Sequence, residues 1–243
     1  MTAPHTVTSF DEDLREIAAF IVDMGIRAAR SVEFAAFALR GSDTRVAQQV
    51  ISADKAIDEL QQDLEQKAIA VIARRQPVAS DLRQIIAALR IANDLERIGD
   101  LSKNLAKRTL AILNDGAPIV GTASLMKLAE RVHAQLENVL AAYKNRDDKA
   151  AIEVWKSDHE IDALHTSLFR ELLTYMMEDP RNIGSCAHLL FCAKNLERIG
   201  DHATNIAETV HYVVTGEVLT LDRPRADQSS GFNEDIRLPP WKG

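Results

Sequence analysis

Apolar residues recur every three or four positions along most of the chain, in long stretches that end at Gly, Pro or Asp. This spacing is typical of amphipathic helices, because positions i, i+3, i+4 and i+7 share one helical face. The first stretch places Ile17, Ile21, Met24 and Ala28 on one face and ends at Gly41. By the same criteria we predict six helices, over about 10–39, 42–76, 80–115, 122–143, 147–177 and 182–216.

The order of these helices predicts an all-α fold. Long helices joined by short loops favour antiparallel neighbours in a bundle. The pattern starts again after the loop near residue 115, so we expect two tandem, pseudo-symmetric three-helix bundles built from six long antiparallel helices. Their predicted boundaries are 10–115 and 116–216. Residues 217–243 contain Pro, Asp and Ser with little periodicity, and we expect them to form a disordered tail.

An identical hexapeptide occurs once in each half. The segment 95–100, Leu-Glu-Arg-Ile-Gly-Asp, returns as 196–201, an offset of 101 residues (197 − 96). In the preceding helix, the pair 54/58 of aspartates is matched by the pair 158/162, an offset of 104 residues (158 − 54). The chain is therefore two copies of one unit. Each copy offers two pairs of carboxylates spaced four residues apart.

The spacing of these acids indicates a cation site. Residues four apart on a helix lie on one face, with β-carbons about 5–6 Å apart. Two such pairs on facing helices gather four carboxylates, which repel one another unless a cation is present. With a cation, the same oxygens suit a hard metal ion such as Fe, Mn or Mg. The candidate ligands are Asp54, Asp58, Glu96 and Asp100 in the first half and Asp158, Asp162, Glu197 and Asp201 in the second, with Asn104 and Asn205 as weaker candidates one turn further on.

The helical phase of the hexapeptide supports this interpretation. An apolar stripe that begins with Leu82 and Ile85 continues at helical spacing to Glu96 and Asp100, so the acids are predicted at inward-facing positions, where an unpaired charge is costly. The glycine inside each hexapeptide costs roughly 1 kcal/mol relative to alanine in a helix. Its presence indicates that another group approaches the backbone closely there.

Two other interpretations of these side chains stay open. The acids could form ordinary salt bridges within their helices, for example Asp100 with Lys103. The pairs Glu130/His133 and Glu208/His211 have the Glu-x-x-His spacing of ferritin-like di-iron proteins. These two pairs do not occupy equivalent positions in the two halves, so we interpret their spacing as coincidental.

Charge and composition exclude several classes of protein. The formal net charge is −7, from 29 Lys and Arg against 36 Asp and Glu, which argues against a nucleic-acid binder that depends on a positive field. Residues 1–9 carry no apolar core of a signal peptide, and no apolar run approaches the roughly 20 residues that span a bilayer. Two cysteines, Cys186 and Cys192, are expected to be buried and reduced. These features predict a cytoplasmic protein.

Around the two hexapeptides the sequence resembles the PhoU family of bacterial phosphate-transport accessory proteins, over roughly 10–216. The segment 76–83, Gln-Pro-Val-Ala-Ser-Asp-Leu-Arg, leads into the first hexapeptide as in that family, and 195–208 is similar to the family's second motif. The resemblance implies two three-helix bundles with metal clusters at the eight acids named above. It also implies a negative regulator of phosphate uptake that acts on the ATPase of the phosphate ABC transporter and on a phosphate-sensing histidine kinase. A homodimer that meets the membrane only through its partners is the expected assembly.

The leading hypothesis is a metal-binding signalling adaptor without enzymatic activity. One alternative is a carboxylate-bridged di-iron enzyme that activates oxygen, although such an enzyme generally needs His ligands in the same core. The other alternative is a structural helical adaptor whose acids are solvated and bind no metal.

Overall fold

The computed structural model describes residues 4–115 and 120–220, so the prediction of a disordered tail falls mainly on residues outside the described part. The elements in chain order are α1 (Pro4–Gly41), α2 (Thr44–Ala53), α3 (Lys55–Arg75), α4 (Ala79–Asp115), α5 (Thr122–Asn145), α6 (Asp148–Glu178), the 3₁₀ turn η1 (Pro180–Asn182) and α7 (Ile183–Thr215). No strand occurs within these ranges. The prediction of an all-α fold built from two sets of long antiparallel helices is confirmed.

An N-capping aspartate begins both α2 and α6. The Asp43 side chain accepts hydrogen bonds from the backbone amides of Arg45 (2.9 Å) and Val46 (3.1 Å), and the Asp147 side chain accepts one from the amide of Ala150 (3.1 Å). An aspartate at this position satisfies amide groups that have no partner within the helix. The two caps are 104 residues apart (147 − 43), the offset already seen for the aspartate pairs. The duplication therefore includes the signals that begin these helices.

The predicted helix over 42–76 is interrupted at Asp54, and the expectation of one continuous helix was wrong at this point. Asp54 keeps right-handed helical angles (φ −56°, ψ −41°). Its carbonyl accepts from the amide of Ile57 at 2.8 Å and from that of Asp58 at 3.3 Å, so the backbone tightens locally into a three-residue turn. The counterpart, Asp158, lies inside the unbroken helix α6. The two halves thus differ at the first of the predicted ligands.

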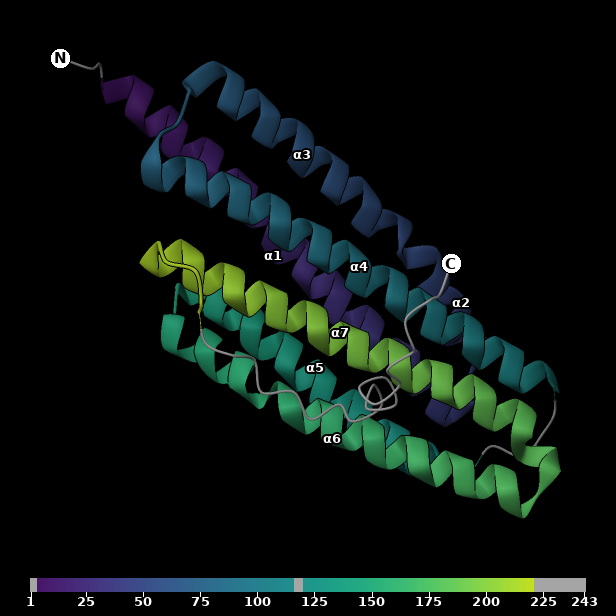
Figure 1. Ribbon diagram of the computed structural model, residues 1–243. Coiled ribbons are helices and arrows are strands. Elements are labelled where there is room, and N and C mark those ends of the chain that lie inside the picture. Colours follow the sequence, from purple (N-terminus) through teal and green to yellow (C-terminus); the bar gives the residue numbers. More distant parts are fainter. Residues whose placement is uncertain (1–3, 116–119, 221–243) are drawn as a thin grey trace, which may run out of the picture.

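Helices α4 and α7 lie side by side through the middle of the molecule and run in opposite directions (Figure 1). Helix α3 lies on the outer side of α4, and α6 lies on the outer side of α7. Helix α1 packs against α4, α5 packs against α7, and α1 and α5 contact each other behind this layer. The acid-bearing helix pairs, α3 with α4 and α6 with α7, therefore lie on opposite flanks of a shared centre.

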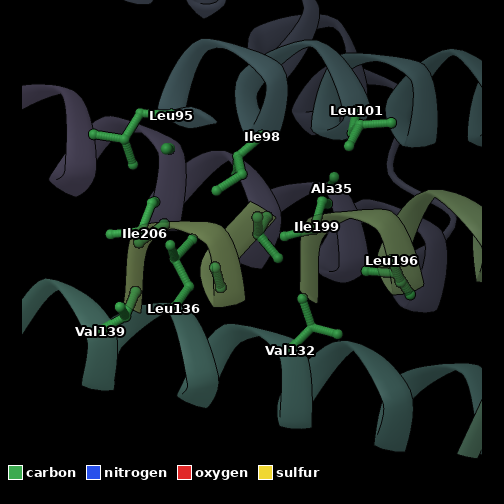
Figure 2. Packing of buried hydrophobic residues seen from close by; sticks show 14 of the residues in the cluster. Ala35, Leu95, Ile98, Leu101, Val132, Leu136, Val139, Leu196, Ile199 and Ile206 are labelled. Atoms are coloured by element: carbon green, nitrogen blue, oxygen red, sulfur yellow. The ribbon is translucent and has the colours of Figure 1, made fainter. Parts of the chain in front are cut away.

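The apolar residues of both hexapeptides form the centre of the core. Leu95 and Ile98 of α4 and Leu196 and Ile199 of α7 are fully buried. Figure 2 shows them between the helices, with Leu136 and other residues of α5 on the far side of α7. The buried apolar side chains form one continuous cluster that spans both halves. Each hexapeptide therefore contributes its Leu and Ile to the core while its Glu and Asp lie to the side.

The predicted inward stripe of α4 holds only in part. Ile85 is fully buried, but Leu82 is exposed and Leu89 is only partly buried against the core. The buried face of a long helix drifts relative to any fixed spacing, because 3.6 residues per turn is not a whole number. Glu96 and Asp100 consequently lie at the edge of the buried face and retain partial exposure.

Cys186 and Cys192 are both buried and unpaired, as predicted. Among the helices that the structure describes, none combines the length and the apolar character needed to cross a bilayer.

Candidate metal-binding carboxylate clusters

The structure brings the eight predicted acids together as two separate sets. The first cluster, between α3 and α4, consists of Asp54, Asp58, Glu96 and Asp100. The second cluster, between α6 and α7, consists of Asp158, Asp162, Glu197 and Asp201. Because α3 and α6 lie on opposite flanks of the molecule (Figure 1), the two clusters are separated by the central helices α4 and α7.

The glycine of each hexapeptide allows the two acid-bearing helices to approach. A β-carbon on Gly99 would lie 3.0 Å from Cδ1 of Ile57 and 3.3 Å from Oδ1 of Asp54. A β-carbon on Gly200 would lie 3.0 Å from Cδ1 of Ile161 and 3.2 Å from Oε1 of Gln135. The close approach inferred from the sequence is therefore present in both halves.

Lys103 bridges the two helices of the first cluster. Its Nζ donates to Oδ2 of Asp54 on one side and to Oδ1 of Asp100, at 2.8 Å, on the other. The hydrogen bonds that it donates to Asp100 and Asp54 raise the pKa of the Lys103 ammonium above its usual range, so the side chain stays charged. Asp54 is only 5% exposed, so water cannot readily reach its side chain. Its Oδ1 is nevertheless without a hydrogen-bond partner among residues 10–115 and 120–220. Lys103 thus neutralises one oxygen of Asp54 and leaves the other as an open acceptor.

Burial and neighbouring negative charges raise the pKa values of two further acids of the first cluster, Asp58 and Glu96. Burial raises the pKa of Asp58, and the negative charge of Asp54 raises it further. Burial also raises the pKa of Glu96, an effect that Arg97 opposes and Asp100 reinforces. Both shifts mean that the charged form of the carboxyl is disfavoured where it lies. An additional cation near these oxygens would relieve that cost.

Neutral hydrogen-bond donors contact Asp158 in the second cluster. Oδ1 of Asp158 accepts from Oγ1 of Thr204 at 3.0 Å and from Nε2 of Gln135 at 3.3 Å. Lys194 donates to Glu197 at 2.8 Å, but its own side chain is 51% exposed. Burial is the main cause of a raised pKa of Glu197, and the hydrogen bond from Lys194 opposes it. The acids of this cluster are also the more deeply buried: Asp158, Asp162 and Glu197 are all buried.

The sequence did not predict three of these contacts, which are those of Lys103 with Asp54 and of Thr204 and Gln135 with Asp158. Lys103 was considered only as a partner of Asp100 within its own helix, and its bond to Asp54, on a different helix, was missed. Thr204 could have been found at the hexapeptide offset of 101 residues (204 − 103). Gln135 belongs to α5, and no sequence signal connects it to the acids of α6.

The carboxylate oxygens of the two clusters are suitable ligands for a hard cation, but they do not surround a common point closely enough to enclose one. Carboxylate oxygens are the preferred ligands of Mg, Mn and Fe in such settings. Within the part of the chain that the structure describes, no three His, Cys, Asp or Glu side chains converge closely enough to enclose a metal ion. The buried, unsatisfied Oδ1 of Asp54 and the raised pKa values of Asp58 and Glu96 fit an additional cation. Enclosing one requires the carboxyl groups to rotate toward it.

The weaker candidates lie outside both clusters. Asn104 and Asn205 are exposed. Nδ2 of Asn205 donates to Oδ1 of Asp94 at 3.4 Å, and Nδ1 of His202 lies 2.9 Å from the same oxygen. Asp94 is a buried carboxylate of α4 that links the two halves, and the repeated acids do not include it because its counterpart is Asn195 (195 − 94 = 101).

The Glu-x-x-His pairs are engaged elsewhere. Oε1 of Glu208 accepts from Nε1 of Trp155 at 2.9 Å, and Nδ1 of His211 lies 2.6 Å from Oδ1 of Asp148. Glu130 and His133 line a groove between α1 and α5. Neither pair joins the carboxylates of the two clusters, which agrees with a coincidental spacing.

Comparison with known proteins identifies the family. A family model described as the PhoU domain matches residues 21–109 and again residues 125–210. The chain is 51% identical over 230 residues to a phosphate-specific transport system accessory protein PhoU homolog of Rhizobium meliloti (strain 1021), covering 95% of this chain and 97% of that protein. It is 48% identical over 224 residues to the protein of the same description from Caulobacter vibrioides (strain NA1000 / CB15N), covering 92% and 97%.

Solved structures agree with these matches. The crystal structure of PhoU from Pseudomonas aeruginosa is similar with a TM-score of 0.83 and 36% identity, covering 86% of this chain and 100% of that one. The phosphate transport system regulatory protein PhoU from Streptococcus pneumoniae is similar with a TM-score of 0.80 and 28% identity, covering 87% and 100%. With a twice-matching family model and near full-length relatives, this chain belongs to the PhoU family.

Proposed function

We propose that this protein is an accessory regulator of the phosphate-specific transport system that lowers phosphate uptake and represses the phosphate-starvation response. The supporting observation is the 51% identity, over 95% of the chain, to a relative described as an accessory protein of that system. The proposed partners are the ATPase of the phosphate ABC transporter and a phosphate-sensing histidine kinase. In this proposal the protein works in the cytoplasm as a homodimer, reaches the membrane only through these partners and catalyses no reaction.

We also propose that the two clusters bind metal cations, with Fe, Mn or Mg as the candidates. What supports this is the pairing of four carboxylates on facing helices in each half, together with the raised pKa values of Asp58, Glu96 and Glu197. A bound cation would supply positive charge that favours the ionised acids. The residues that would hold it are the eight acids themselves, and those of α3 and α6 would thereby be drawn toward α4 and α7.

Deleting the gene tests the regulatory role. In cells grown at high phosphate, we expect the deletion strain to express alkaline phosphatase constitutively, because repression of the starvation response is lost. A plasmid copy of the wild-type protein should restore repression. Normal repression in the deletion strain would contradict the proposal.

Removing charge from one cluster tests metal binding. The double variant Glu96→Gln with Asp100→Asn removes two carboxylates from the first cluster, and Glu197→Gln with Asp201→Asn removes the equivalent two from the second. We expect helical circular dichroism to survive in both proteins, since these substitutions keep the side-chain size. Elemental analysis should show that at least one variant loses metal relative to wild type. Unchanged metal content in both variants would exclude the clusters as the binding sites.

A further inference from the structure

We propose that Lys103 serves as a built-in cation of the first cluster, and that the two clusters therefore bind metal ions unequally, with the second cluster the stronger site. This inference rests on the proposed metal binding and adds to it the residue that sets the difference between the halves. Nothing in the repeated hexapeptide itself distinguishes the two sites, because it is identical in both.

The position of the Lys103 ammonium is that of a bridging cation. It lies between Asp54, which precedes α3, and Asp100 of α4, and it donates to a carboxylate oxygen of each. The contact with Asp100 is an ordinary pair three residues apart on one helix. The contact with Asp54 joins residues 49 positions apart, on two different helices, and it is the one that places charge inside the cluster. The Lys103 side chain is only 24% exposed, so solvent screens this charge weakly.

The second cluster has a neutral residue at the equivalent place. Thr204 occupies the position of Lys103 at the hexapeptide offset (204 − 103 = 101). Its hydroxyl lies 3.0 Å from Oδ1 of Asp158, the counterpart of Asp54. A hydroxyl satisfies one hydrogen bond of a carboxylate but adds no positive charge. Lys194 contacts Glu197 from a half-exposed position on the same helix and is no substitute for a bridging ammonium.

These contacts give the two clusters different affinities for a metal ion. A cation that enters the first cluster either displaces the ammonium from Asp54 and Asp100, and so replaces one positive charge with another, or binds beside it at the open Oδ1 of Asp54 and is repelled by its charge. A cation that enters the second cluster meets a hydroxyl and an amide on Asp158 where the first cluster has an ammonium on Asp54, and it meets the more deeply buried acids. Charge–charge attraction is stronger where solvent is excluded. We expect the second cluster to bind a divalent ion at least about tenfold more tightly than the first, with tenfold corresponding to about 1.4 kcal/mol.

Exchanging the two residues tests the inference, with Mn²⁺ as the probe. Metal-free full-length protein is titrated with Mn²⁺ by calorimetry or by electron paramagnetic resonance of the free ion. For wild type we expect one class of tight sites, abolished by Glu197→Gln with Asp201→Asn and retained in Glu96→Gln with Asp100→Asn. Lys103→Thr, which copies the second half, should add a class of tight sites. Thr204→Lys, which copies the first half, should remove the tight class.

Matched controls separate a charge effect from a general loss of structure. Lys107→Thr removes an exposed lysine one turn further along α4 and should leave Mn²⁺ binding unchanged. Since Thr204 is fully buried, Thr204→Lys could fail to fold, and Lys103→Met then decides the matter, because it removes the charge while keeping the length of the side chain. In the absence of metal, Lys103→Thr should lower the melting temperature, and Mn²⁺ should restore it. A purely structural lysine would give the first effect without the second.

The possible results distinguish this inference from the function on which it rests. Equal Mn²⁺ affinity at both clusters in wild type, unchanged in Lys103→Thr, would overturn the role of Lys103 and leave metal binding intact. No Mn²⁺ binding by wild type or by Lys103→Thr would overturn both. A tight class that appears only when Lys103 is replaced, with none in wild type, would overturn the stronger second site.

Discussion

Replacing Ile199 by alanine is expected to lower the free energy of unfolding by about 2–5 kcal/mol, the range for truncating a large buried aliphatic side chain. Ile199 is fully buried in the apolar cluster that joins both halves, and Figure 2 shows it on α7, between α4 and α5. The loss combines the transfer free energy of the removed methyl and methylene groups with the cavity that they leave. For a chain of this length, at roughly 2–4 °C per kcal/mol, the melting temperature should fall by about 4–20 °C.

The number of thermal unfolding transitions indicates whether the two halves unfold together. Because one continuous apolar cluster joins both halves, Ile199→Ala should destabilise α1–α4 together with α5–α7, and thermal unfolding should remain a single cooperative transition. Calorimetry and circular dichroism would measure this directly. The matched control is Ile69→Ala, since Ile69 is 66% exposed and its truncation should change the stability by less than about 0.5 kcal/mol. Two resolved transitions, with only one shifted by Ile199→Ala, would show that the halves unfold independently.

Replacing Gly200 by leucine is expected to destabilise the protein by about 1–3 kcal/mol and to weaken metal binding at the second cluster. The new β-carbon would lie 3.0 Å from Ile161 and 3.2 Å from Gln135, so α5 and α6 must move away from α7 to make room for the rest of the side chain. The better helix propensity of leucine recovers roughly 1 kcal/mol of that cost. Because α6 carries Asp158 and Asp162, its displacement separates them from Glu197 and Asp201.

Chemical denaturation and Mn²⁺ titration measure the two effects of Gly200→Leu separately. Gly41→Leu is the control, because a β-carbon on Gly41, at the end of α1, meets no atom within 4 Å. We expect the control to retain both stability and Mn²⁺ affinity. If Gly200→Leu were as stable as wild type and bound Mn²⁺ equally well, the close approach of α6 to α7 would not be needed to assemble the second cluster.

The placement of the two clusters bears on the proposed regulatory role. They lie on opposite flanks of one shared core, and each joins an outer helix to a central one. In the proposed metal-binding role, a change in occupancy at either cluster would act on the outer helix of its own half, α3 or α6. The break in the helical backbone at Asp54, which has no counterpart at Asp158, and the different residues at 103 and 204 make the two halves chemically distinct.

Much of the fold could be predicted from local patterns. The 3.6-residue periodicity and the Gly, Pro and Asp residues that end its stretches located the helices, because apolar residues at this spacing share one helical face and those residues interrupt it. The interruption at Asp54 could not be predicted in this way, since Asp54 itself has helical backbone angles and the residues around it are compatible with a helix. The exposure of Leu82 was also mispredicted, because the face that a long helix buries depends on which neighbours cover each of its turns.

The candidate site, like the fold, could be predicted from the sequence only in part. The repetition of the hexapeptide and of the aspartate pairs, readable from the sequence alone, determined that the carboxylates exist in two equivalent sets and that a glycine lies beside each, because residue identity and spacing are retained through duplication. Only the tertiary structure decided what surrounds each set: Lys103 reaches Asp54 across two helices, whereas Thr204 and Gln135 reach Asp158. The physical reason is that the energy of a carboxylate depends on burial and on charges within a few ångströms, and those distances are fixed by how helices pack rather than by their order along the chain.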